Sequence, residues 1–177
     1  MKREFFKLKN QNIMQIKDFV NKYWQSAVKC ANYYTLPLPV ILTQAGLESG
    51  WGESLYGNNF FGIKADASWK GDKQLLWTYE YINGVKTRVQ SYFRKYATPE
   101  ESFMDYGAFI YGNKRYQAAR ETYKLDGNMH GYIDRIAAAG YATAPDYASS
   151  LKATLANVMK YLPADWQYTT TDEKKKK

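Results

Sequence analysis

The sequence predicts an α+β domain in which several helices surround one small β-hairpin. Apolar residues recur at helical spacing through much of the chain, and an Asn-Gly pair at 83–84 separates two segments rich in strand-forming residues. A chain of 177 residues is long enough for one domain that buries about 70% of its unfolded surface. Hydrophobic residues make up 45% and charged residues 24%, which excludes a collagen-like or wholly disordered chain.

The first expected helix covers residues 13–33, where apolar side chains recur at helical spacing. Residues 1–12 are polar and irregular in pattern, and residues 165–177 are rich in Thr and Lys. We therefore expect a flexible N-terminal segment and a flexible Lys-rich tail. No linker, low-complexity stretch or repeat interrupts the chain between them, so residues 13–164 are expected to form one domain.

Proline and glycine mark the next elements. Pro37 and Pro39 precede a helix expected over residues 40–49, and Gly50 is suited to end it. Strands are expected over residues 75–82 and 85–93, because the Asn-Gly pair between them is a strong hairpin signal.

The second half of the chain is expected to be helical. Thr98, Pro99 and Glu101 form an N-cap, a proline in the first turn and a capping-box glutamate, which predicts a helix through about residue 111. Three more helices are expected near residues 115–123, 129–139 and 145–162.

The supply of cysteine and histidine excludes several kinds of site. With one cysteine, Cys30, and one histidine, His130, the chain has neither an internal disulfide nor a Cys/His zinc site. We expect Cys30 to be a buried apolar side chain and His130 to be a surface or capping residue. No Ser/His/Asp arrangement or phosphate-binding loop is present, and no metal or cofactor is expected.

The net charge of +8 favours a polyanionic partner such as nucleic acid, an anionic membrane surface or an acidic wall polymer. The basic residues are scattered and no nucleic-acid motif is present, so a nucleic-acid partner is not expected. There is no apolar run of about 18 residues, and we expect no membrane insertion. No ordinary signal peptide is visible, and we expect a monomer.

Glu48 is the candidate catalytic residue that the sequence itself indicates. It follows Ile41 and Ala45 at helical spacing, which places it on an apolar stripe, and it lies in the last turn before Gly50. Desolvation and the negative end of the helix dipole would both raise its pKa, as a general acid requires. The alternative is a surface glutamate whose carboxylate escapes past the end of the helix.

Several motifs resemble, in order, those of the bacterial glucosaminidase domain, glycoside hydrolase family 73. Its members include the wall-cutting domain of the flagellar rod-cap protein, autolysins and phage lysins. The likeness covers roughly residues 15–162. It rests on Ala45-Gly46-Leu47-Glu48-Ser49-Gly50-Trp51-Gly52 and on residues 58–65, 78–84, 93–96 with 101–103, and 139–148.

The resemblance implies a lysozyme-like fold and hydrolysis of the β-1,4 bond after N-acetylglucosamine in peptidoglycan glycan strands. The family's catalytic glutamate falls on Glu48. Its second carboxylate, carried by the hairpin beside the active-site cleft, falls on Glu80, and its active-site tyrosine falls on Tyr141. Motif positions near the substrate groove are Trp51, Asn59, Phe60, Phe61 and Lys64. The chain departs from the commonest family pattern at Gly46 and at the Asn59-Phe60 pair, which could alter the shape of the groove.

Structural roles remain open for several of these residues. On the expected strand, Glu80 shares a face with Leu76, Thr78 and Ile82, an unusual place for a solvated charge, yet it could instead pair with Lys86 or Arg88. Tyr141 could be an ordinary packed tyrosine, and Phe60 or Phe61 could belong to the core.

Alternatives also remain open for the function. They are muramidase-type cleavage by the same residues and a non-catalytic wall-binding module. We expect the protein to act on the bacterial cell wall, in the periplasm or outside the cell, and to reach it by a phage or secretion-machine route. The cleavage stereochemistry is left open between retention, inversion and assistance by the substrate's acetamido group.

Overall fold

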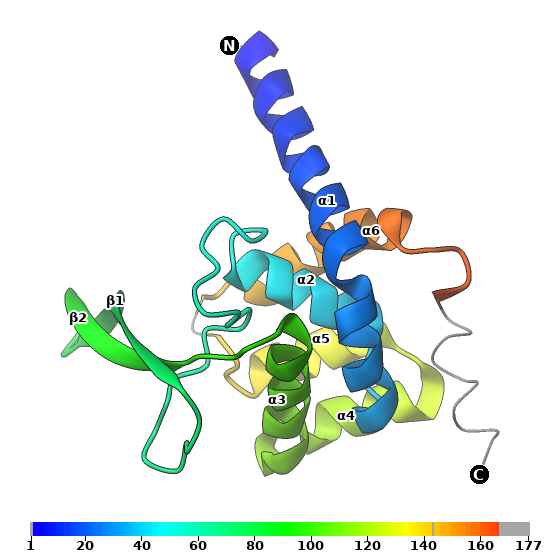
Figure 1. Cartoon of the computed structure of the whole chain (residues 1–177). Helices are drawn as coiled ribbons and strands as arrows, with labels where there is room; N and C mark the ends of the chain where they lie inside the picture. The colour runs from blue at the N-terminus through cyan, green and yellow to red at the C-terminus, as the bar shows by residue number, and fades with distance from the viewer. Residues whose placement is uncertain (1, 143, 167–177) are drawn as a thin grey trace.

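The computed structural model describes residues 2–142 and 144–166, which form six α-helices, a short 3₁₀ helix and one two-stranded hairpin (Figure 1). The α+β class is therefore confirmed. In chain order the elements are α1 (Lys2–Tyr34), α2 (Leu38–Glu48), β1 (Lys73–Ile82), β2 (Val85–Arg94), α3 (Pro99–Gly112), η1 (Lys114–Tyr116), α4 (Gln117–Asp126), α5 (Met129–Ala138) and α6 (Tyr147–Tyr161).

The first helix begins earlier than the sequence pattern predicts. It begins at Lys2, so the expected start of the helix at residue 13 is wrong. This segment contains neither Pro nor Gly and is rich in Lys, which favours continuation of the helix even without an apolar stripe. Figure 1 shows this part of α1 extending away from the rest of the domain. The predicted Lys-rich tail lies, apart from residues 165 and 166, outside the described residues.

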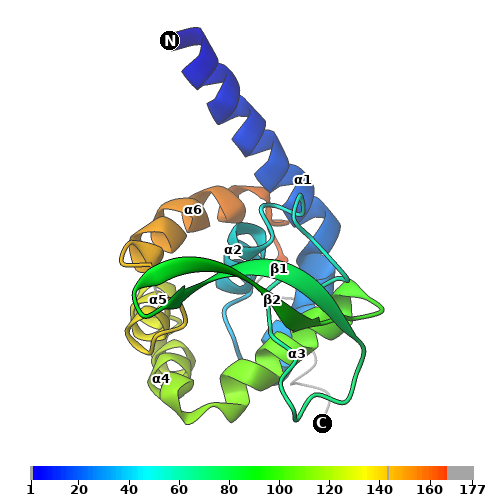
Figure 2. The same cartoon turned by 90° about the vertical axis from the view of Figure 1, so that its left-hand side faces the viewer.

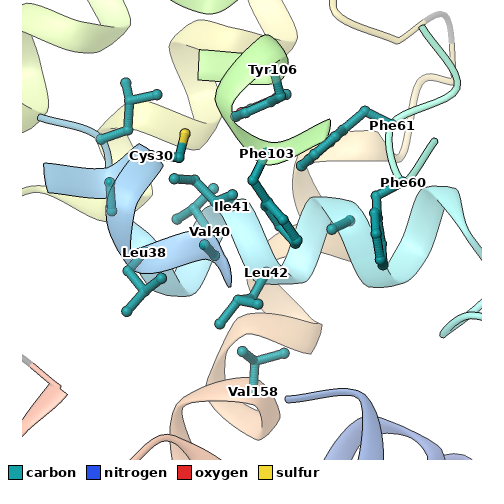
Figure 3. Close-up of a cluster of buried hydrophobic side chains, with 14 of the residues drawn as sticks. Cys30, Leu38, Val40, Ile41, Leu42, Phe60, Phe61, Phe103, Tyr106 and Val158 are labelled. Atoms are coloured by element: carbon teal, nitrogen blue, oxygen red, sulfur yellow. The ribbon is translucent and has the colours of Figure 1, made fainter. Parts of the chain in front are cut away.

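Helix α2 forms the centre of the core. Every residue from 38 to 46 is buried, and a helix that is buried all round must be covered by other elements. It packs against α1 and α6, and Figure 3 shows Leu42 of α2 directed toward Val158 of α6. Pro37 precedes its first turn as predicted. Because the helix is packed on all sides, the position of its last residue, Glu48, is fixed by the core.

The other helix signals act as predicted. Thr98 accepts a hydrogen bond from the backbone N–H of Glu101 (3.3 Å), and the Glu101 carboxylate accepts one from the N–H of Ala97 (2.9 Å). Cys30 is buried between α1 and α3, where burial raises the pKa of its thiol to about 12, and His130 is exposed. Both residues therefore have the surroundings that the sequence predicted.

The hairpin forms at the predicted turn. Ile82 pairs with Val85, and Asn83 (φ 51°) and Gly84 (φ 79°) both adopt the left-handed backbone that a two-residue turn of this kind requires. Figure 2 shows the hairpin in front of the helical body. Its two faces differ, because half-buried and exposed residues alternate over residues 74–80 of β1 and 86–93 of β2.

The base of the hairpin is fixed to α3 and to the loop that follows α2. Arg94 at the end of β2 donates two hydrogen bonds to Asp105 of α3 (2.9 and 2.8 Å), and the Tyr96 hydroxyl donates a third (2.7 Å). Asn59 bonds to the backbone of Ile63 and to the carbonyl of Arg94. These contacts hold the hairpin beside the end of α2.

Candidate active site

Glu48 is the last residue of α2, where the chain turns sharply. The Ser49 hydroxyl donates to the carbonyl of Ala45 (2.6 Å) and accepts from the N–H of Gly52 (3.1 Å). Gly50 and Trp51 both have positive φ, of 58° and 56°. This turn ends the helix at the predicted place and directs the chain into the loop over residues 53–72.

Two cavities meet at Glu48. The first, here the hairpin cavity, has a volume of about 580 Å³ and is lined by Glu48, Ser54, Tyr56, Asn59, Gly62, Leu76, Trp77, Thr78 and Phe93. The second, here the tyrosine cavity, has a volume of about 560 Å³ and is lined by Glu48, Phe61, Gly62, Ile63, Lys64, Asp66, Arg94, Phe109, Arg115, Tyr116, Tyr141 and Ala142. Because Glu48 and Gly62 line both, the two cavities adjoin at these residues, and we refer to the pair of cavities as the groove.

The groove desolvates Glu48. Glu48 is exposed, yet it lines both cavities. The surrounding protein raises the pKa of Glu48 above its usual value by desolvation. A carboxyl group with these properties can retain its proton at higher pH and donate it to a ligand in the groove.

Glu80 lies on the half-buried face of β1, the face that carries Leu76 and Thr78 in the hairpin cavity. It forms an ion pair with Lys64, which lines the tyrosine cavity. Glu80 is not among the described residues that line either cavity, and it contacts the groove through its ion pair with Lys64. The alternative partners, Lys86 and Arg88, lie instead over the rings of Tyr79 (4.8 Å) and Trp77 (4.5 Å).

Tyr141 lines the tyrosine cavity together with Glu48. Its ring stacks on that of Tyr147, with centroids 5.7 Å apart and planes at 23°. Burial raises the pKa of the Tyr141 hydroxyl, and Tyr147 and the carboxylate of Glu48 raise it further. Tyr141 is therefore a neutral hydroxyl group beside the candidate acid.

A buried hydrogen-bond network behind Tyr141 was missed by sequence reasoning. Gln44 is fully buried, accepts a hydrogen bond from the hydroxyl of Tyr106, and donates one to the hydroxyl of Tyr147 (2.8 Å). It thereby links α2, α3 and the ring on which Tyr141 stacks. The available signal was a polar amide in a largely apolar helix, one turn before Glu48.

Trp51 and Phe60, two of the expected groove residues, pack in or against the core. The Trp51 ring meets Phe19 edge-on (5.5 Å) and lies directly over Gly46, while Phe60 is fully buried against Phe19, Tyr23 and Phe103. Within the described chain, neither contributes to the lining of the two cavities.

The other three expected groove residues reach the cavities. Asn59 lines the hairpin cavity, and its amide is used to hold the loop and the hairpin base together. Phe61 and Lys64 line the tyrosine cavity, where Phe61 also stacks on Tyr106 at 4.1 Å.

Two arginines of the tyrosine cavity, Arg94 and Arg115, were not singled out by sequence reasoning as site residues. No cluster of three or more His, Cys, Asp or Glu side chains that could hold a metal ion occurs among the described residues. None of the described helices combines the length and apolar composition needed to cross a membrane.

Comparisons with known proteins agree with this geometry. The glucosaminidase family model, described as mannosyl-glycoprotein endo-beta-N-acetylglucosaminidase, matches residues 24–160. The peptidoglycan hydrolase FlgJ of Vibrio cholerae is 40% identical over 139 residues, which cover 75% of this chain and 41% of that protein. The exo-glucosaminidase LytG of Bacillus subtilis is 35% identical over 129 residues, which cover 68% of this chain and 43% of that protein. This chain thus spans less than half the length of these relatives.

Solved structures agree as well. The glycoside hydrolase domain of Salmonella typhimurium FlgJ, truncated at its C-terminus, matches with a TM-score of 0.69 and 34% identity over 82% of this chain and 98% of that domain. The catalytic domain of the autolysin Auto from Listeria monocytogenes matches with a TM-score of 0.73 and 26% identity over 84% of this chain and 88% of that domain. The family model, the motifs around Glu48 and the shared fold lead to one conclusion: this chain belongs to the glucosaminidase family, glycoside hydrolase family 73.

Proposed function

We propose that this chain is a peptidoglycan hydrolase that cleaves β-1,4 bonds of the glycan strand, as an endo-β-N-acetylglucosaminidase that uses Glu48 as general acid. The observation that carries the proposal is a desolvated carboxyl group at the junction of two cavities, with a raised pKa. A glycan strand that fills both halves of the groove would place a glycosidic oxygen beside this group. The family model, whose description is that of an endo-glucosaminidase, and the likeness to the peptidoglycan hydrolase FlgJ support this reaction, and the likeness to the exo-glucosaminidase LytG supports the glucosaminidase bond.

In the proposed reaction the proton of Glu48 passes to the departing glycosidic oxygen while positive charge develops on the sugar. The C–O bond breaks, and water supplies the hydroxyl group of the new reducing end. The raised pKa of Glu48 serves this step because it keeps the acid protonated at higher pH.

Glu80 is the proposed second carboxylate, which aligns the water or stabilises the developing cation. Its position on the groove-side face of β1 and its ion pair with Lys64 support this role. We expect Glu80→Gln to lower the rate on purified peptidoglycan by more than about threefold, because glycoside hydrolysis normally needs a second carboxylate. A smaller loss would exclude Glu80 as the base.

Tyr141 is proposed to orient the substrate's acetamido group or the water through its hydroxyl, since it lines the same cavity as Glu48. Asn59, Phe61 and Lys64 are proposed to shape the groove, and Trp51 and Phe60 to support it from the core side. The protein is proposed to act as a monomer at the cell wall, which it would reach by a phage or secretion-machine route.

The products test the proposed bond. Purified peptidoglycan is digested with the wild type, and mass spectrometry after borohydride reduction identifies the sugar at each new reducing end. An endo-glucosaminidase releases fragments that end in reduced N-acetylglucosamine. Fragments that end in reduced N-acetylmuramic acid would replace the proposal with a muramidase, and no fragments at all would reject hydrolysis.

A further inference from the structure

The two halves of the groove differ in charge. Apart from Glu48, the residues that line the hairpin cavity are uncharged. The tyrosine cavity, by contrast, is lined by three cations, Lys64, Arg94 and Arg115, and besides Glu48 by one carboxylate, that of Asp66, so positive charge is in excess there. A negatively charged group of a ligand would therefore be more favourably placed in the tyrosine cavity than in the hairpin cavity.

Two of these three cations already have carboxylate partners within the protein. Lys64 pairs with Glu80, and Arg94 pairs with Asp105 at 2.8 Å and with Asp66 at 3.9 Å. The side chains of Arg94 and Asp105 are only 14% and 18% exposed, so this pair is mostly structural. Neither cation is free to bind an anion without losing a protein contact.

Arg115 differs from both. It is exposed, lines the tyrosine cavity, and has no carboxylate within ion-pair distance in the part of the chain that the structure describes. Its guanidinium carbon lies 4.6 Å from the ring centroid of Tyr116, which is fully buried. Tyr116 is in turn held by the rings of Phe109 and Tyr141. The guanidinium therefore stands on a rigid aromatic support, and no ion pair with a described carboxylate neutralises its charge.

We propose that Arg115 forms a carboxylate-binding subsite in the tyrosine cavity, which holds the acidic peptide arm of the glycan strand. The proposal rests on the proposed function, because it identifies which part of the peptidoglycan this half of the groove binds. Every second sugar of that polymer, N-acetylmuramic acid, bears a peptide with free carboxylates, whereas N-acetylglucosamine is neutral. A planar guanidinium binds a carboxylate with two parallel hydrogen bonds, and the uncharged hairpin cavity suits the unsubstituted sugar.

Affinity measurements in the Glu48→Gln background test the subsite without turnover. Isothermal titration compares Glu48→Gln with the double variant E48Q/R115Q on two ligands: a wall tetrasaccharide that carries its peptide arms, and the neutral tetramer of N-acetylglucosamine. We expect E48Q/R115Q to bind the acidic ligand about tenfold more weakly and the neutral tetramer unchanged, because a hydrogen bond to a charged group is lost for one ligand only. Lysine in place of Arg115 keeps the charge but not the paired donors of the guanidinium, so Arg115→Lys in the same background is expected to bind the acidic ligand with an affinity between those of Glu48→Gln and E48Q/R115Q.

Two controls make the result specific. Lys114→Gln removes a neighbouring positive charge from a side chain outside the cavity lining and is expected to change neither affinity. Methyl esterification of the carboxylates of the acidic ligand is expected to lower its affinity for Glu48→Gln to that of E48Q/R115Q. Equal weakening for both ligands, or no weakening for either, would overturn the subsite.

The outcome is distinguishable from a failure of the proposed function. If the wild type cleaves peptidoglycan and Arg115→Gln leaves the affinity for the acidic ligand unchanged, the subsite alone is rejected. If the wild type releases no fragments and Glu48→Gln binds neither ligand, the proposed function fails and the subsite fails with it.

Discussion

Glu48 combines two properties that a surface glutamate rarely has together: its carboxyl group is accessible from a groove, and its pKa is raised by desolvation. Both follow from its place at the end of a buried helix, because α2 brings its last residue from the core to the floor of the groove. The sequence predicted this place from the apolar spacing and from Gly50. It could not predict the second wall of the groove, which comes from residues 54–66 and from the hairpin.

The raised pKa of Glu48 predicts a pH-dependent cost to stability. The folded state binds this proton more tightly than the unfolded chain does, whose pKa is near 4.5, so the stabilisation from protonation is lost as pH rises through the folded-state pKa. We therefore expect the melting temperature of Glu48→Gln, relative to the wild type, to rise between about pH 4 and about pH 8. Calorimetry at both pH values checks this. A difference that is constant or falls with pH would contradict it.

Lys64, the ion-pair partner of Glu80, was not among the partners that the sequence left open for this residue. The sequence left Lys86 or Arg88 open as partners on the neighbouring strand, but the residue opposite Glu80 is Thr87, and Lys86 and Arg88 lie on the other face, over the rings of Tyr79 and Trp77. Lys64 reaches Glu80 only because the loop after α2 runs along β2, where Ala65 donates to the carbonyl of Tyr92 (2.9 Å). No local pattern encodes that path.

At the scale of elements, Gly46 explains how α2 and the turn after it fit together. A Cβ atom at position 46 would lie 2.1 Å from Cζ3 of Trp51, a distance that no packed structure allows. Trp51 is fixed there by the positive φ of the turn and by its contact with Phe19. The departure from the common family pattern at this position therefore matches the close approach of the tryptophan ring.

We expect Gly46→Ala to destabilise the fold by about 1–3 kcal/mol, because the Trp51 ring must move out of a packed site. Urea unfolding measures the change. The matched control is Gly112→Ala in α3, where a Cβ atom meets nothing within 4 Å and the better helix propensity of alanine should be neutral or stabilising. Equal stability of Gly46→Ala and the wild type would contradict this account of the turn.

The elements that the sequence predicted well carry strong local signals. The hairpin follows from Asn83-Gly84, and the start of α3 follows from the Thr98 cap, because both depend on backbone geometry within a few residues. The predicted start of α1 was wrong, because residues 2–12 lack the apolar stripe on which the prediction relied. Their intrinsic helix propensity is sufficient for the helix to continue through them.

At the scale of the whole molecule, the groove depends on one charged anchor between the hairpin and the helices. Arg94 and Asp105 are mostly buried and joined by two hydrogen bonds. Their separation along the chain gave no reason to pair them, so the sequence placed the strand and α3 correctly but not their contact.

We expect Asp105→Asn to lower the free energy of unfolding by about 3 kcal/mol, because it leaves the Arg94 charge mostly buried and without its main partner. Urea unfolding and hydrogen exchange at the base of the hairpin measure the effect. As a control, Glu100→Gln removes an exposed pair with Lys29 and is expected to cost less than about 1 kcal/mol. Similar losses of unfolding free energy for the two variants would contradict a larger contribution of the buried Arg94–Asp105 pair.

The central claim, that Glu48 donates the proton, is tested most directly by comparing turnover and binding in Glu48→Gln. The rate on purified peptidoglycan is measured at saturating substrate, together with the affinity for a wall tetrasaccharide, and Glu53→Gln in the neighbouring loop serves as control. We predict a rate loss of about 100-fold to about 10,000-fold with the affinity and the fold retained, and no loss in the control. A Glu48→Gln variant that is folded and cleaves at the wild-type rate would contradict the account.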